Sequence, residues 1–252
     1  MRRGVAAALA VAAVAALTGA AVVTWAPWAS SAPSSTSTTS ACGTSYAPVL
    51  DPANFQTVVD NPYFPLPVGR KLVYSGVKDG QAQTDTVTVT DQHKLILGIT
   101  ATVVHDVATH DATVLEQTFD YYAQDTQGTV WYLGEDTTAF LPNGKADTSG
   151  SFQAGVDGAQ PGIIMQATPQ VPDAYRQECY AGQAEDTAWV VATEGSVRVP
   201  YGNVRNVLTT LEATRLEPGA YDQKVYGPGI GIVSEQSLTG PNETSQLVSV
   251  SG

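Results

Sequence analysis

The sequence lacks the short motifs by which many enzymes are identified. It has no Gly-x-Ser-x-Gly elbow, no Walker phosphate loop, no His-Glu-x-x-His motif and no Cys-x-x-Cys pair. These absences argue against common serine hydrolases, P-loop nucleotide-binding proteins and zinc proteases. The nearest approach to a ligand cluster is His105 and His110 with Asp106 and Asp111. Residues five apart on one strand point to opposite faces, so we expect no metal site and no cofactor.

Basic residues are also scarce. The chain has 24 acidic and 12 basic residues, and two of the basic ones, Arg2 and Arg3, lie near the N-terminus. The remaining part carries all 24 acids and ten bases, which gives it a net charge of −14. Such a field repels nucleic acid and anionic lipid. We therefore expect no nucleic-acid partner, and contact with a membrane only through an uncleaved N-terminal segment.

Long amphipathic helices are the third absence. No stretch after residue 45 shows a sustained apolar stripe at helical spacing. Alternating patterns predict an all-β domain instead, with a hairpin turn at Lys78-Asp-Gly80. The strands are expected at 71–77, 83–90, 99–107, 114–124, 129–135, 188–193, 196–200, 206–215, 221–226, 231–237 and 245–250.

The centre of the chain follows a different pattern. Residues 137–183 are rich in Gly, Pro, Asp and Ala, which predicts long irregular loops with at most a short helix near 172–179. On either side, residues 119–132 and 221–233 echo each other as strand, turn and strand. This echo suggests two related β-units that form one curved sheet or open barrel, although two hairpins also resemble each other by chance.

The N-terminal part reads as an export segment. Arg2 and Arg3 precede an uncharged, Ala/Val-rich run, and a stretch of small polar residues follows. Residues 1–31 are thus either a cleaved signal peptide or an N-terminal membrane anchor, because the run is also long enough to span a bilayer. Residues 32–45 form a Ser/Thr-rich linker, and 46–252 form a single exported β-rich domain. We expect the protein to be secreted or held in the cell envelope.

The two cysteines, Cys42 and Cys179, lie in this predicted exported part. An even number of cysteines in an oxidising compartment favours a disulfide. The bond would connect the end of the linker to the middle of the domain.

Four segments resemble a group of uncharacterised exported bacterial proteins. They are Asn61-Pro-Tyr-Phe-Pro-Leu-Pro-Val-Gly69, residues 118–135 (TFDYYAQDTQGTVWYLGE), residues 154–165 (AGVDGAQPGIIM), and the pair VRVPYGNV (197–204) and YGPGIGIVSE (226–235). The last pair also resembles envelope proteins with a strongly curved antiparallel half-barrel. The resemblance implies a half-barrel or open-barrel fold and supplies no activity.

One predicted hairpin carries the most suggestive side chains. Pairing Gln124 with Thr129 places Asp120 opposite Leu133 and Glu135 opposite Thr118. Asp120, Tyr122, Trp131 and Glu135 then share one face. Acids and aromatic rings on the concave face of a curved sheet could hold a polar, cationic or stacked ligand. The alternative is that the rings fill the core and the acids lie at its wet rim.

Three functions follow from these patterns. The first is a non-enzymatic exported domain that binds a small or lipophilic ligand in a concave face. The second is an extracellular hydrolase that uses carboxylates of the central region, with Glu178, Glu185 and Asp186 as candidates for acid–base catalysis. The third is a structural surface protein.

Overall fold

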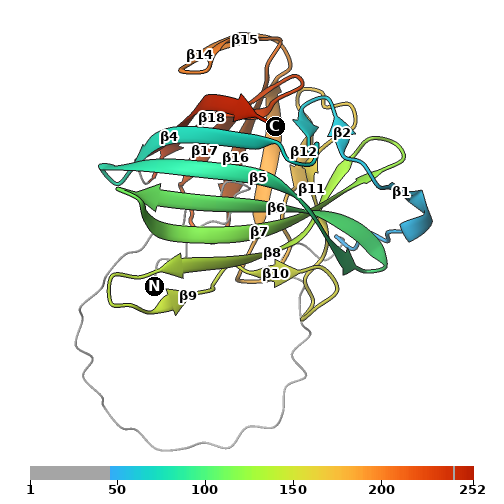
Figure 1. The fold of residues 1–252 in the computed structure, drawn as a ribbon. Coiled ribbons are helices and arrows are strands. Elements are labelled where there is room, and N and C mark those ends of the chain that lie inside the picture. Colours follow the sequence, from blue (N-terminus) through green and yellow to red (C-terminus); the bar gives the residue numbers. More distant parts are fainter. Residues whose placement is uncertain (1–45, 241) are drawn as a thin grey trace, which may run out of the picture.

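The computed structural model describes residues 46–240 and 242–252 and shows an all-β protein (Figure 1). The only helical element in these residues is the 3-10 turn η1 (Pro52–Asn54). Within them, no helix has the length and hydrophobicity that crossing a membrane requires. The predicted leader and linker, residues 1–45, lie outside the described residues, so whether the leader is cleaved remains a prediction.

Two antiparallel meanders form one large, strongly curved sheet. In the first, β4 (Lys71–Lys78), β5 (Gln81–Ile96), β6 (Ile99–His110), β7 (Thr113–Asp125) and β8 (Val130–Phe140) pair in sequence. The second comprises β13 (Asp186–Ala192), β16 (Leu208–Thr214), β17 (Tyr221–Gly227), β18 (Gly231–Thr239) and β19 (Glu243–Ser251). Strand β19 pairs with β4 and thereby joins the meanders, which face each other across the interior in Figure 1. The sheet does not close into a barrel, which confirms the curved antiparallel fold class.

The predicted strands are present, and most are longer than the alternation indicated. The hairpin turn between β4 and β5 is also confirmed: Asp79 and Gly80 have φ values of 51° and 80°. Two positive φ values in succession are the conformation that a two-residue type I′ hairpin needs, and Asp-Gly adopts it readily. That the two meanders are related β-units remains a prediction.

The central region contains four short strands rather than loops alone. They are β9 (Ala146–Asp147), β10 (Phe152–Gln153), β11 (Gly162–Met165) and β12 (Ala174–Arg176). Residues 172–179, where at most a short helix was expected, contain a strand instead, because Ala174–Arg176 pair with Thr187–Trp189 of β13. Tyr175 is buried between less buried neighbours, a period of two that suits an edge strand.

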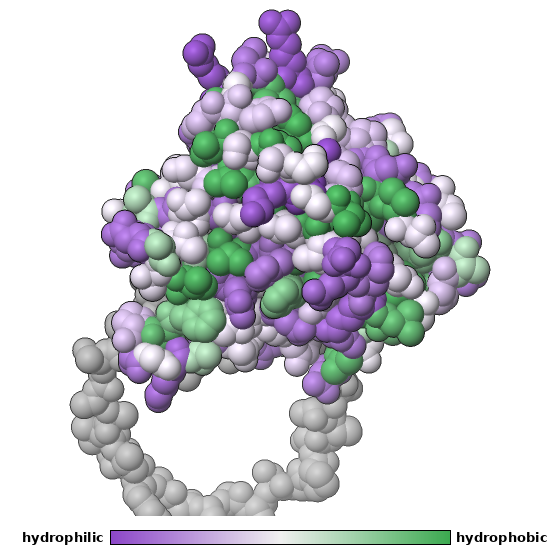
Figure 2. All heavy atoms as spheres, in the orientation of Figure 1, coloured by the Kyte–Doolittle hydropathy of each residue, from purple (hydrophilic) through white to green (hydrophobic). Residues whose placement is uncertain are grey.

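The remaining strands lie around the main sheet. Strand β1 (Phe55–Gln56) pairs with β7, and β2 (Asp60–Asn61) pairs with β3 (Phe64–Pro65). Strands β14 (Ser196–Val199) and β15 (Gly202–Arg205) form a separate hairpin that projects at the top of Figure 1. On the face shown in Figure 2, hydrophobic residues are scattered among hydrophilic ones and form no continuous patch.

Alternation along the strands produces two cores. The larger one fills the concave side and includes Tyr122, Tyr132, Leu208, Tyr226 and Leu247, each at most 2% exposed. A smaller core covers the convex side of β6–β8, where Ala154 and neighbouring residues pack on the sheet. Side chains therefore pack against both faces of the first meander.

Candidate functional site

The β7–β8 hairpin has a different register from the one expected. The Asp125 carboxylate accepts hydrogen bonds from the backbone N–H groups of Gln127 and Thr129, at 2.9 and 3.0 Å, and the turn is one residue longer. Gln124 consequently pairs with Val130. A slip of one residue exchanges the two faces of a strand, so this small change in the turn decides which aromatic ring faces the interior.

The predicted position of Trp131 on the concave face is therefore wrong. It pairs with Ala123 and packs against the convex core, where its Nε1–H donates to Asp125 at 2.9 Å. Tyr132 takes the concave position, and its ring stacks on Tyr122 with 4.8 Å between centroids. Trp131 does not share a face with Tyr122 and cannot line a concave ligand site with it.

Asp120 and Glu135, by contrast, meet inside the curved sheet. A bulge beside Tyr121 brings them directly opposite each other, and they are 4% and 0% exposed. The Tyr132 hydroxyl lies 2.5 Å from Asp120 Oδ1 and 3.0 Å from Glu135 Oε2. One hydroxyl carries one proton, so it can donate to only one of them. The other contact then requires a protonated carboxyl group as donor.

Burial explains why these carboxyl groups hold protons. Desolvation raises the pKa of Asp120 to about 7, and the hydrogen bond from Tyr132 only partly opposes this. Desolvation and the nearby Asp120 carboxylate raise the pKa of Glu135 well above its ordinary value. Both shifts favour the protonated carboxyl group, which can serve as the donor that the second contact with Tyr132 needs.

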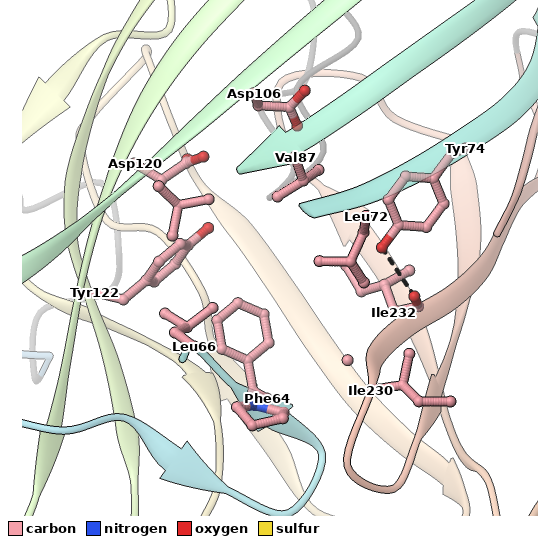
Figure 3. A pocket seen from close by; sticks show the side chains of 13 residues that line it. Phe64, Leu66, Leu72, Tyr74, Val87, Asp106, Asp120, Tyr122, Ile230 and Ile232 are labelled. Carbon is pink, nitrogen blue, oxygen red and sulfur yellow. Dashed lines mark hydrogen bonds between the residues drawn. The ribbon is translucent and has the colours of Figure 1, made fainter. Parts of the chain in front are cut away.

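The predicted residues Asp120 and Tyr122 line an inner cavity (Figure 3). Asp106 and Asp120 lie on one side of it, and apolar side chains such as Phe64, Leu66 and Ile230 lie on the other. Its volume is about 40 Å³, which is room for a few water molecules. This is far below the roughly 300–1,000 Å³ of ordinary ligand pockets.

The proline-rich segment 61–69 closes this end of the interior. The Phe64 ring packs edge-on against Tyr122, with 5.0 Å between centroids. The Asn61 side chain donates to the carbonyl oxygens of Gly128 and Gln166, at 2.9 and 3.0 Å. The segment is thus a fixed plug rather than a strand of the sheet, as its prolines require.

A second hollow lies at the other end of the first meander. A groove of about 560 Å³ lies between the β4–β5 hairpin and the end of β8, and we call it the mouth. It is lined by Lys78, Asp79, Gly80, Gln81, Gln83, Ala108, Leu115, Glu116, Ala139, Phe140 and Pro142. Its volume is that of a small-molecule site. The sequence reasoning missed it, although Glu116, Thr118 and Asp120 alternate with period two on one face of the strand.

The three hydrolase candidates do not form an accessible acid pair. Glu185 accepts hydrogen bonds from the Arg215 guanidinium at 2.7 and 2.9 Å and from the Gly182 N–H at 2.8 Å, which is a structural role. Glu178 and Asp186 are 1% and 3% exposed, and burial raises both pKa values, that of Asp186 to about 8. None of the three lines the mouth or the inner cavity.

A buried lysine balances part of the interior charge. Lys224 Nζ is fully buried, 2.8 Å from Glu212 Oε2 and 3.9 Å from Glu235 Oε1. Burial alone lowers the pKa of Lys224, but the two carboxylates outweigh it and raise the pKa above its usual value. Desolvation raises the pKa of Glu235 to about 8 although Lys224 opposes the shift. Lys224 therefore neutralises mainly Glu212.

The histidines considered as metal ligands have other contacts. His105 stacks on Phe119 with 4.3 Å between ring centroids, and His110 Nδ1 lies 2.6 Å from the Ala82 carbonyl oxygen. In residues 46–240 and 242–252, no group of three or more His, Cys, Asp or Glu residues has an arrangement that could hold a metal ion.

Cys179 is buried, and Cys42 lies outside the described residues, so the disulfide between them remains a prediction. The Tyr46 hydroxyl donates to the Pro161 carbonyl at 2.8 Å, and the neighbouring Gln160 N–H donates to the Cys179 carbonyl at 2.8 Å. The described chain thus starts beside the segment that contains Cys179.

No protein-family model and no curated protein sequence matches the chain. Two solved structures are similar in part. One is a candidate exported protein with a YmcC-like fold from Bacteroides fragilis, 14% identical, with a TM-score of 0.44 over 75% of this chain and 99% of that one. The other is a candidate lipoprotein from Parabacteroides distasonis, 10% identical, with a TM-score of 0.40 over 76% and 99% of the two chains.

Proposed function

We propose that this chain is an exported, non-enzymatic β-domain that binds a small amphipathic ligand in the concave side of its sheet, at the mouth. The observation that carries the proposal is the mouth's volume of about 560 Å³, which is that of an ordinary ligand site, whereas the inner cavity of about 40 Å³ has room for only a few water molecules. The export segment at the N-terminus supports a role outside the cytoplasm.

The lining of the mouth suits a ligand with both apolar and polar parts. Leu115 and Phe140 offer apolar surface, and Phe140 is 43% exposed. The buried Glu116 and Lys78 supply charged groups nearby. The small side chains of Ala108 and Ala139 leave space on the floor between them. An apolar wall with a few converging polar groups is the usual composition of a ligand site.

A substitution that fills the space between Ala108 and Ala139 tests this proposal. In the Ala139→Leu variant the added methyl groups occupy the mouth itself. The matched control is Ala82→Leu, which lies on the exposed side of the β4–β5 hairpin and outside the groove. Native mass spectrometry of the full chain purified from its host should detect a retained small molecule in the wild type and in Ala82→Leu, and much less in Ala139→Leu.

Two results would contradict the proposal. One is that the wild-type protein purified from its host carries no small molecule. The other is that the Ala139→Leu and Ala82→Leu variants retain the small molecule equally. Circular dichroism spectra of the three proteins should coincide, because position 139 lies within a regular strand and lines the groove that the larger side chain would fill.

A further inference from the structure

The β14–β15 hairpin carries two arginines on its outer face. Ser196 pairs with Arg205, and Arg198 pairs with Asn203. Residues directly opposite each other in an antiparallel pair share a face, and all four of these side chains are exposed. The other face consists of valines that pack against the larger core, namely Val197, Val199 and Val204. The hairpin therefore has a seated apolar face and an exposed polar face with two positive charges.

This outer face is both fixed and accessible. The backbone N–H of Tyr201, in the turn of the hairpin, donates to the Leu247 carbonyl oxygen of β19 at 2.9 Å. Figure 1 shows the hairpin standing out from the main sheet, and Figure 2 shows hydrophilic side chains projecting at the top of the molecule in the same orientation. Because the backbone is already held in place, a partner that binds there pays little to order it.

The two arginines are not neutralised by the rest of the domain. Among residues 46–240 and 242–252, no residue forms an ion pair or a hydrogen bond with the guanidinium group of Arg198 or Arg205. The acid nearest to them in the sequence is Glu194, which is exposed at the base of the hairpin. Arg198 and Arg205 lie diagonally across the strand pair, with Cβ atoms roughly 7–8 Å apart. Like charges this close do not stabilise a hairpin, so stability alone does not explain the pair.

The pair contrasts with the other bases of this acidic chain. After residue 45 the sequence has 24 acids and ten bases. Four of these bases form ion pairs, which are Lys78 with Glu243, Lys94 with Asp136, Arg215 with Glu185, and Lys224 with Glu212. Two arginines that share one exposed face and have no such partner point to an anionic group from outside the described chain.

We infer that the outer face of the β14–β15 hairpin binds a polysaccharide that carries carboxylate groups. Each guanidinium group presents a planar fork of N–H donors that matches a carboxylate. The Asn203 amide and the Ser196 hydroxyl beside them can bond to sugar hydroxyls. The Tyr201 side chain, 45% exposed at the turn, offers a ring on which a sugar can stack. The face shares no residue with the mouth, so this inference is independent of the proposed function.

Other anionic partners fit less well. The net charge of −14 repels a densely charged phosphate polymer and an anionic membrane surface. A uronic acid polymer is slender and carries only one charge per sugar. It can reach a projecting hairpin, while salt screening over about 8 Å weakens its repulsion by more distant acids. Such polymers belong outside the cytoplasm, where the N-terminal segment is predicted to send the domain.

Biolayer interferometry of the immobilised full-length chain tests the inference with polygalacturonate, neutral dextran and polyphosphate as probes. At low salt we expect polygalacturonate to bind at least about tenfold more tightly than the other two probes. Arg198→Gln and Arg205→Gln should each weaken this binding several-fold, and the double variant should nearly abolish it. The control is Lys145→Gln, which removes one exposed positive charge between β8 and β9 and should leave the binding unchanged.

Three results would overturn the inference. They are no binding of polygalacturonate by the wild-type chain, equal binding by the wild type and the arginine double variant, and tighter binding of dextran or polyphosphate than of polygalacturonate. Both arginines are exposed, so the variants should keep the wild-type circular dichroism spectrum. If the double variant does not fold, Asn203→Asp places an acid directly opposite Arg198 and should weaken polygalacturonate binding in the same way. None of these measurements depends on a ligand in the mouth.

Discussion

The buried carboxyl groups predict that this protein is more stable in mild acid than at neutral or alkaline pH. Burial raises the pKa of Asp120 from 3.8 to about 7. It raises that of Asp186 from 3.8 to about 8 and that of Glu235 from 4.5 to about 8. In each case the folded protein binds the proton more tightly than the unfolded chain. Their stabilising contribution is therefore complete below the ordinary pKa and is lost as the pH rises through the folded-state pKa.

The magnitude follows from the size of the shift. For Asp120, a shift of about three pH units corresponds to roughly 4 kcal/mol of unfolding free energy, at 1.36 kcal/mol per unit. This loss develops between pH 4 and pH 7, and the losses for Asp186 and Glu235 extend to about pH 8. Since whole domains are stable by only 5–15 kcal/mol, one such group already gives a measurable slope.

Urea denaturation of the full chain at half-unit steps from pH 4.5 to 8.5 is the appropriate assay. The Asp120→Asn variant keeps an oxygen that can accept from Tyr132 but has no charge to bury. Relative to wild type, it should gain up to about 4 kcal/mol as the pH rises from 4.5 to 8. The Asp91→Asn variant is the control, because Asp91 is exposed and its substitution should leave the pH profile unchanged.

A wild-type stability that is flat or rises between pH 5 and 8 would refute this reasoning. So would an Asp120→Asn profile parallel to that of the wild type. In either case the interior acids would have to be ionised and neutralised by a cation that accompanies the protein, and a pH slope that appears only after extensive dialysis would identify that situation.

Two further predictions concern the framework around the site. A Cβ at Gly162 would lie 1.8 Å from the Gln177 carbonyl oxygen. Gly162→Ala should therefore lower the unfolding free energy, measured by urea titration, by roughly 1–3 kcal/mol or more. An unfolding free energy within about 0.5 kcal/mol of the wild-type value would show that β11 does not pack against Gln177 as described. Thiol titration of the exported chain under denaturing, non-reducing conditions should find neither Cys42 nor Cys179 reactive, and reduction should cost roughly 4–5 kcal/mol of stability, as for a loop of more than a hundred residues; two titratable thiols would disprove the bond.

The strand pattern was predictable because it depends on local chemistry. The alternation of Thr and Val in β5 and the Asp-Gly turn before it depend on neighbouring residues only. The ends of the strands were less predictable, since β5 and β8 extend into polar sequence where pairing with neighbours outweighs intrinsic preference. The short strand β12 was missed for the same reason: its edge pairing with β13 connects distant parts of the chain.

The candidate site was predicted only in part, because the length of the β7–β8 turn could not be inferred from the sequence. Asp120, Tyr122 and Glu135 do face the interior, but Trp131 does not. The Asp125 carboxylate lengthens the turn by one residue, which composition alone does not reveal. The mouth was missed because it combines residues from five strands whose mutual register depends on that turn and on the bulges.

The chemistry of the interior also separates this domain from a simple lipid-binding half-barrel. A curved sheet that only shelters acyl chains needs an apolar concave face. Here Asp85, Asp106, Asp120 and Glu135 are placed along that face beside tyrosine rings, each nearly inaccessible to water. Buried acids lower stability unless protons or cations accompany them. Burial raises the pKa of each of the four, so protons supply this balance in mild acid, and the concave face becomes costlier to keep buried as the pH rises.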